Sequence, residues 1–101
     1  MRVLLFFDLP TLSSNDLRNY RKFRKFLLRN GFLMLQESVY CKLALNQTVV
    51  DSVINLLRHN TPPSGNVMFF CITEKQFSKI ELLVGEKDSD TLDSTDRMVI
   101  L

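Results

Sequence analysis

An uninterrupted apolar run, Val3–Phe7, lies near the start of the chain and is closed by Asp8 and Pro10. A strand with one solvated face alternates apolar and polar residues, whereas a strand covered on both faces is apolar along its length. The run therefore predicts a strand over Arg2–Leu9 at the centre of a sheet. Because proline has no backbone N–H to donate to a neighbouring strand, we expect the chain to leave the sheet at Pro10.

The length of 101 residues, with 46% apolar and 24% charged, is that of one globular domain with a single core. Its apolar runs reach only five or six residues, far below the ~20 needed to cross a membrane, and no signal-peptide cleavage site follows the first run. Cys41 and Cys71 each lie within an apolar run, which favours buried thiols over a disulfide. We expect a cytoplasmic protein that has no membrane segment.

Two helices are predicted around an extended region. Capping residue types at Ser13–Asn15 and a stop at Gly31 predict a helix over Asn15–Asn30. Asn46 predicts the N-cap of a second helix over Gln47–His59. Between the helices, Phe32–Leu45 indicates two short strands joined near Gln36–Glu37.

The second half of the chain predicts further strands. A loop at Asn60–Gly65 precedes a buried strand over Val67–Ile72, and Lys79–Val84 mostly alternates, as in an edge or partner-pairing strand. The order predicts an α+β fold, ferredoxin-like βαββαβ, with an extra C-terminal strand. Residues 1–84 form this domain, and residues 85–101 form an acidic, flexible tail with an apolar end. Such a fold hosts many functions, so it fixes none by itself.

The first predicted helix carries a basic arc opposite its apolar face. Arg24 is an exception, since it falls inside the apolar face and is expected either to extend along the edge of the core or to face a subunit partner. Tyr20, Phe23 and Phe26 lie on the core side, which favours phosphate contacts to a duplex over base stacking on single strands. A solvated helix surface is the alternative. The arc consists of Arg18, Arg21, Lys22, Lys25 and Arg29.

Asp8 is the one candidate for metal chemistry, because it follows the apolar run directly. Mg²⁺ is held by one or two carboxylates with water and phosphate oxygens. A single Asp8 is a poor site, whereas two copies brought together by a symmetric dimer would be a credible one. The alternative is that Asp8 caps the following turn or helix. The single histidine, His59, ends a predicted helix and is expected to contact terminal carbonyls rather than bind zinc.

Three motifs in order resemble a known family. An aromatic–Asp pair, Phe7–Asp8, ends the first strand, Arg21–Phe23 lies on the basic helix ahead of Gly31, and Gln36–Tyr40 follows. This arrangement resembles the small CRISPR-associated adaptation protein ("Cas-two") family over residues 1–84, and the branch from single-effector (type II) CRISPR systems in particular.

The resemblance implies a ferredoxin-like homodimer in which the two Asp8 residues face each other and hold Mg²⁺ as metal-binding and catalytic groups. Family members are described as metal-dependent endonucleases of RNA or DNA, and as the scaffold on which the CRISPR integrase subunit and double-stranded DNA assemble. Gln36 and Ser38 match the family motif as groups that support the fold or the metal ligand.

This chain departs from the family pattern at two positions. Phe7 replaces a usual Tyr, and Cys41 stands where the family often has an acid. Both departures remove polar groups, so the scaffold role ranks ahead of the nuclease. A small-ligand-binding regulatory domain of the same fold is the alternative function.

Overall fold

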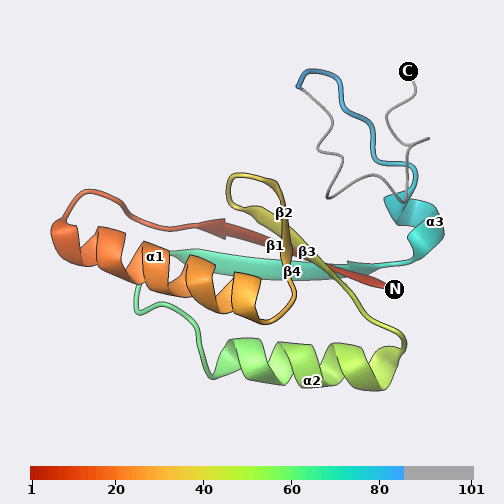
Figure 1. Ribbon diagram of the computed structural model, residues 1–101, viewed down its shortest axis with the longest axis horizontal. Helices are drawn as coiled ribbons and strands as arrows, with labels where there is room; N and C mark the ends of the chain where they lie inside the picture. The colour runs from red at the N-terminus through yellow and green to blue at the C-terminus, as the bar shows by residue number, and fades with distance from the viewer. Residues whose placement is uncertain (86–101) are drawn as a thin grey trace.

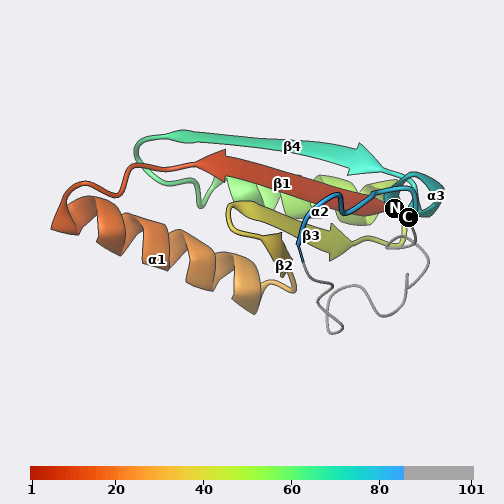
Figure 2. The same cartoon turned by 90° about the horizontal axis from the view of Figure 1, so that it is seen from above.

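The structure, a computed structural model that describes residues 1–85, is a four-stranded antiparallel sheet with helices packed against it (Figures 1 and 2). The strands lie in the order β2-β3-β1-β4, which is the ferredoxin-like arrangement. This confirms the predicted α+β fold. The elements are β1 (Arg2–Asp8), α1 (Ser14–Arg29), β2 (Leu33–Gln36), β3 (Val39–Leu43), α2 (Gln47–Arg58), β4 (Asn66–Ile72) and α3 (Glu74–Phe77).

β1 is the central strand, as its continuous apolar run predicts. It pairs with β3 on one side and with β4 on the other. Val3, Leu5 and Phe7 point into the main core beneath α1 and α2, whereas Leu4 points to the opposite face, into a smaller core under α3. Figure 1 shows α3 on the other side of the strands from α2. We call this opposite side the second face of the sheet.

Both long helices begin at the residues that the sequence indicates. Ser13 is the N-cap of α1, and it forms a reciprocal capping box with Asp16, with nitrogen–oxygen distances of 3.0 and 3.1 Å. Asn46 caps α2 through its side-chain oxygen, which accepts from the Val49 N–H at 3.0 Å. At the other end of α1, Gly31 has a φ of +84°, a left-handed conformation that glycine adopts without strain.

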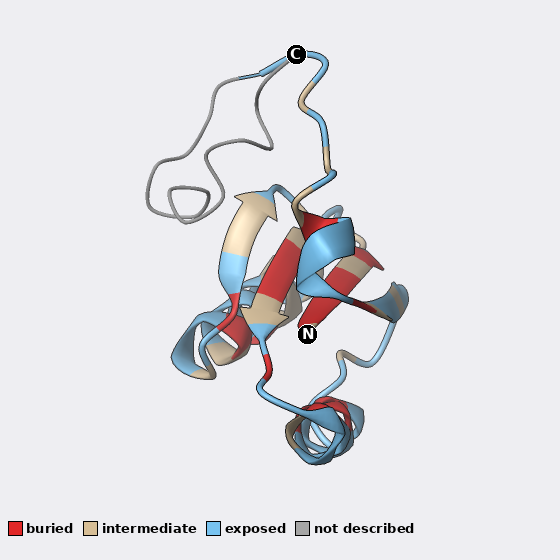
Figure 3. Ribbon diagram, turned by 90° about the vertical axis from the view of Figure 1, so that its right-hand side faces the viewer, coloured by how far each residue is buried: buried red, intermediate tan, exposed pale blue. Residues whose placement is uncertain are grey.

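β4 departs from the prediction of a fully buried strand. Met68 and Phe70 are 63% and 62% exposed, because β4 is an edge strand and no helix of residues 1–85 covers this part of the second face. Figure 3 shows that the buried residues, drawn in red, are concentrated in the middle of the sheet. The prediction of burial on both faces was therefore wrong within a single chain.

The predicted strand over Lys79–Val84 is also absent from the described part of the chain. Thr73 forms a capping box with Gln76 and turns the backbone into α3 directly after β4. The segment that follows is irregular, and its Ile80 and Leu82 pack against the smaller core. A strand needs a hydrogen-bonded neighbour, and none of the four strands within residues 1–85 pairs with this segment.

The remaining boundaries differ little from the prediction. The turn between β2 and β3 lies at Glu37–Ser38, one residue later than expected, and Ser38 has a φ of +66°. The predicted acidic tail lies outside the described residues, apart from Gly85. No helix within residues 1–85 has the length and apolar character to span a membrane.

Candidate functional site

A row of positive charges runs along the outer side of α1. We call Arg18, Arg21, Lys22, Lys25 and Arg29 the basic stripe, and every one of them is exposed. The ion pair found within residues 1–85 joins Arg2 to Glu74, so no carboxylate of the described chain neutralises the stripe. An open groove lined by Ser14, Arg18, Arg21, Lys22 and Lys25 runs over this surface.

The opposite side of α1 fixes the direction in which the stripe points. Phe23 and Leu27 are buried against the sheet, so the charged arc has to face solvent. Arg24, which falls between the two sides, donates from Nε to the Tyr40 hydroxyl at 3.1 Å. Tyr40 is buried and stacks on Phe7. Arg24 therefore binds a residue at the edge of the core and does not belong to the stripe. This confirms the first of the two roles expected for it.

Asp8 is exposed at the end of β1, opposite Asn66 of β4. Since side chains alternate along a strand, Asp8 lies on the second face together with Phe6. Its carboxylate makes no hydrogen bond or ion pair with residues 1–85. The alternative reading of Asp8 as a cap was therefore wrong, because Ser13 caps α1.

One chain does not contain a complete metal site among its described residues. No group of three or more histidine, cysteine, aspartate or glutamate side chains within residues 1–85 is placed to hold a metal ion. A lone exposed carboxylate can provide one ligand to Mg²⁺. A second Asp8, supplied by another chain, would give Mg²⁺ a second carboxylate ligand.

Ser38 supports the end of β1 through its backbone. No such role is seen for Gln36 within residues 1–85. The Ser38 carbonyl accepts a hydrogen bond from the Phe7 N–H at 3.0 Å, so the β2–β3 turn holds the backbone next to Asp8. Gln36 is exposed at the end of β2, where a bulge separates it from Met34 in the pairing with β3. The structure thus places Ser38 as a backbone support and brings neither side chain to the Asp8 carboxylate within residues 1–85.

The second face carries an apolar surface that the sequence interpretation missed. Phe6 of β1 lies opposite Met68 of β4, and Phe70 follows two residues later on the same face. We call these three residues the open patch. Phe6 is half-buried and the other two are well exposed. The signal was present in the continuous apolar sequence of β4, which indicates burial but does not tell whether the covering element belongs to the same chain.

Buried titratable groups tie α3 to the sheet. Arg2 donates to Glu74 at 2.8 Å, and its guanidinium lies 4.2 Å from the centre of the Phe77 ring. Burial opposes the charge on Arg2, but Glu74 outweighs it and the pKa of Arg2 is raised. Burial also raises the pKa of the neighbouring Cys41 thiol, against the opposing effect of Arg2.

His59 contacts the Asn55 carbonyl through Nδ1 at 2.8 Å, as predicted for a helix end.

Comparison with known proteins identifies related sequences over the whole chain. The family model for CRISPR associated protein Cas2 matches residues 1–80. A protein of Treponema denticola is 45% identical over 101 residues, which is 100% of both chains. A protein of Streptococcus mutans serotype c is 46% identical over 100% of this chain and 93% of its own, and one of Lacticaseibacillus rhamnosus is 38% identical over 100% of both. Each of the three is named CRISPR-associated endoribonuclease Cas2.

Proposed function

The chain belongs to the CRISPR associated protein Cas2 family, and from this we propose that it works as a dimeric, duplex-DNA-binding scaffold in the complex that inserts new spacers into a CRISPR array. The observation that carries the proposal is the basic stripe, whose five side chains are exposed and free of carboxylate partners within residues 1–85. The family assignment leaves no support for the alternative of a small-ligand regulatory domain.

The dimensions of the stripe suit the backbone of a double helix. From Arg18 to Arg29 an α-helix rises about 16 Å, because each residue adds ~1.5 Å. A duplex presents a phosphate about every 3.4 Å of its axis on each strand. One stripe can therefore contact several successive phosphates. Contacts of this kind hold DNA without reading its sequence, as a scaffold for varied spacers requires.

The open patch supports the dimer. Two copies that pack through their second faces would cover Met68 and Phe70, which are 63% and 62% exposed, and the accessible part of the half-buried Phe6. Because α1 and α2 lie on the other side of the sheet, both basic stripes would remain outside the interface. The outer edge of β4 is unpaired within residues 1–85, and residues 79–84 of the second copy are its proposed strand partner.

Binding to a blunt DNA duplex at several salt concentrations tests the scaffold role. The protein should be tested alone and with its CRISPR integrase subunit, the proposed partner. We expect the affinity to fall steeply with salt, with a slope of about 0.9 per phosphate neutralised. Absence of duplex binding in both preparations, or an affinity independent of salt, would contradict the proposal.

A second candidate function is Mg²⁺-dependent cleavage of RNA or DNA. It is favoured by the exposed Asp8, which has no partner within residues 1–85, and by the relatives' name, CRISPR-associated endoribonuclease Cas2. In a dimer joined through the second faces, the Asp8 carboxylates lie on the surfaces that meet, and the pair would hold the ion. Mg²⁺ bound there would supply an activated water for attack on phosphorus. It ranks second because Asp8 has no acid or base partner within residues 1–85.

A further inference from the structure

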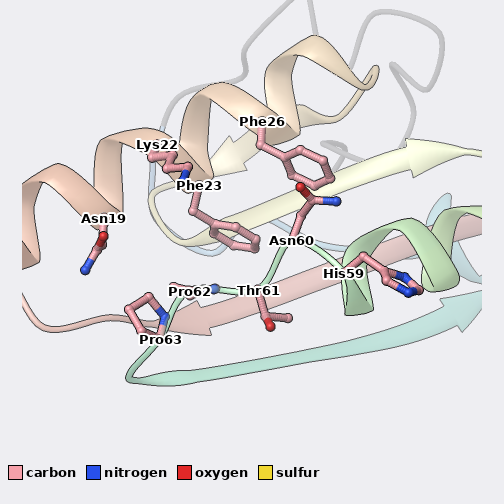
Figure 4. Close-up of a pocket in the computed structure, with 9 residues that line it drawn as sticks. All are labelled: Asn19, Lys22, Phe23, Phe26, His59, Asn60, Thr61, Pro62 and Pro63. Carbon is pink, nitrogen blue, oxygen red and sulfur yellow. The ribbon is translucent and has the colours of Figure 1, made fainter.

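A small cavity lies beside the basic stripe, between α1 and the loop that follows α2 (Figure 4). We call it the loop cavity. Its volume is about 180 Å³, well below the ~300 Å³ of sites for drug-sized ligands. Its lining includes Asn19, Lys22 and Phe26 from α1, and Asn60, Thr61 and Pro62 from the loop.

Apolar rings form part of the wall of the loop cavity. Figure 4 shows Phe23 and Phe26 pointing from α1 toward the loop that carries Asn60, Thr61 and Pro62. The two phenylalanine rings are nearly parallel, with centres 6.3 Å apart and an angle of 17° between them. Phe23 is buried, but Phe26 is only half-buried. The helix pattern placed Phe26 on the core side, whereas the structure leaves part of its ring accessible to a planar ligand.

Polar groups with unused hydrogen-bonding capacity within residues 1–85 surround these rings. The Asn19 amide, the Lys22 ammonium and the Thr61 hydroxyl make no hydrogen bond or ion pair with residues 1–85. Asn60 donates from Nδ2 to the Leu56 carbonyl at 2.8 Å, so its side-chain oxygen remains free to accept. Amides and hydroxyls around an aromatic wall match the edges and the flat face of a nucleobase.

Lys22 connects the loop cavity to the basic stripe. It lines both this cavity and the open groove that runs over the stripe. A phosphate held at Lys22 would therefore place its attached nucleotide at the mouth of the loop cavity. The cavity suits one base in size, but a base pair would not fit.

We propose that the loop cavity receives the base of an unpaired nucleotide, such as one at the end of a duplex whose backbone lies on the basic stripe. The proposal rests on the proposed nucleic-acid-binding function of that stripe. It adds a contact that a duplex interior cannot make, since paired bases are enclosed in the helix. The protein would then prefer duplexes with unpaired ends over blunt ones.

Paired DNA ligands test this preference. A blunt duplex is compared with the same duplex carrying one unpaired 2-aminopurine nucleotide at each end. Stacking of one base on an aromatic side chain predicts at least about fivefold tighter binding of the second ligand, with quenching of the 2-aminopurine fluorescence. Equal affinity for the two ligands, without quenching, would overturn the proposal.

Three variants test whether the loop cavity causes the preference for duplexes with unpaired ends. Phe26→Leu removes the ring but keeps an apolar side chain, and Asn19→Phe fills the cavity from the surface of α1. Both should bind the two duplexes equally. Asn15→Phe is the matched control, because Asn15 is exposed on the same helix outside the cavity, and it should retain the preference. A preference that persists in Asn19→Phe would count against the cavity.

Titration with a free mononucleotide separates this proposal from the scaffold function. Adenosine monophosphate should shift the NMR signals of Phe26 and His59, which both line the cavity, and Asn19→Phe should abolish the shift. If the nucleotide binds there while no blunt duplex binds, the cavity stands and the duplex function fails. If the blunt duplex binds while the nucleotide and the unpaired end have no effect, the duplex function stands and the cavity proposal fails.

Discussion

Asp8 combines two properties. Its carboxylate is exposed and unpartnered within residues 1–85, yet it lies on the same face as the apolar Phe6. Contact between two such faces would bring two carboxylates together, where they repel each other unless a cation separates them. The position therefore favours a role that appears only in the assembled protein.

The variant Asp8→Asn tests that role. Mg²⁺ prefers anionic oxygen ligands, so we expect any Mg²⁺-dependent cleavage to fall at least about a hundredfold, which corresponds to ~3 kcal/mol of lost stabilisation. Duplex binding and the dimer should remain, because the amide has nearly the same shape. Cleavage of labelled RNA and DNA measures the effect.

Glu37→Gln is the matched control for Asp8→Asn. Glu37 is exposed in the turn that supports the end of β1, and its neutralisation should leave cleavage unchanged. A wild-type rate in Asp8→Asn, in protein free of contaminating nuclease, would remove Asp8 from the catalytic assignment.

Cys41 predicts a measurable pH dependence of stability. Burial raises the pKa of its thiol above the ordinary value of 9.0, so the unfolded chain loses this proton at lower pH than the folded one. The free energy of unfolding should then decrease as the pH rises from 9 through the folded pKa, by up to ~1.4 kcal/mol per pH unit. Denaturant unfolding at pH 7–10 measures it.

Cys41→Val separates this effect from other alkaline titrations. The valine has no ionisable group, so the variant should lose less stability between pH 9 and 10 than the wild type does. Identical slopes for the two proteins would show that the thiol is not responsible.

At the scale of elements, we predict how charge reversal on α1 changes the affinity for duplex DNA. Arg21→Glu combined with Lys25→Glu reverses two adjacent positions of the basic stripe. We expect duplex affinity to fall by at least about tenfold at moderate salt, and the salt slope to decrease by about two units, since each lost phosphate contact removes ~0.9. Fluorescence anisotropy with a labelled duplex measures both quantities.

A charge-matched control excludes a general effect of net charge. Arg58→Glu with Lys75→Glu changes the net charge by the same amount on α2 and α3, where both side chains are exposed. This pair should retain most of the affinity and the original slope. An equal loss in both double variants would show that the stripe has no special role.

Elements governed by local chemistry could be predicted from the sequence. The capping residues Ser13 and Asn46 begin their helices as expected, and Gly31 ends α1. β4 and Lys79–Val84 could not be predicted in the same way, because an apolar or alternating pattern indicates burial or pairing without naming the partner. Both errors concern surfaces that residues 1–85 leave uncovered or unpaired.

In the candidate site, too, the sequence predicted the features that local patterns determine and missed those that depend on packing. The sequence pattern was sufficient to place the basic stripe on one side of α1 and Asp8 at the end of the central strand. It did not reveal the loop cavity, because Phe26 and Thr61 are distant in sequence and meet only through the packing of α1 against the loop. The assignment to the type II branch and the contacts with the integrase subunit stay predictions.

At the scale of the whole molecule, the two faces of the sheet have different roles. The helix face provides the main core and presents the basic stripe outward. The second face holds a smaller core under α3, and residues 1–85 leave Asp8 and most of the open patch exposed there. Dimerisation through the second face would complete a metal site and bury apolar surface, and both stripes would stay available to DNA.

Phe70→Lys tests this division directly. The Phe70 side chain is 62% exposed, and full burial of a phenylalanine contributes about 1.5–3 kcal/mol. Each interface contains two copies, and lysine adds a charge that must be desolvated. We therefore expect the dissociation constant of the dimer to rise at least about tenfold, as measured by analytical ultracentrifugation.

Leu12→Lys is the control for Phe70→Lys, because Leu12 is 98% exposed in the loop before α1. It should leave the dimer intact. Deletion of residues 78–101 provides an independent variant, since it removes both the proposed strand partner of β4 and the contacts of Ile80 and Leu82 with the smaller core. The truncated chain should be monomeric or aggregate. If it forms a stable dimer, and Phe70→Lys does so as well, the second face is not the interface, and Asp8 then has no second carboxylate with which to hold a metal ion.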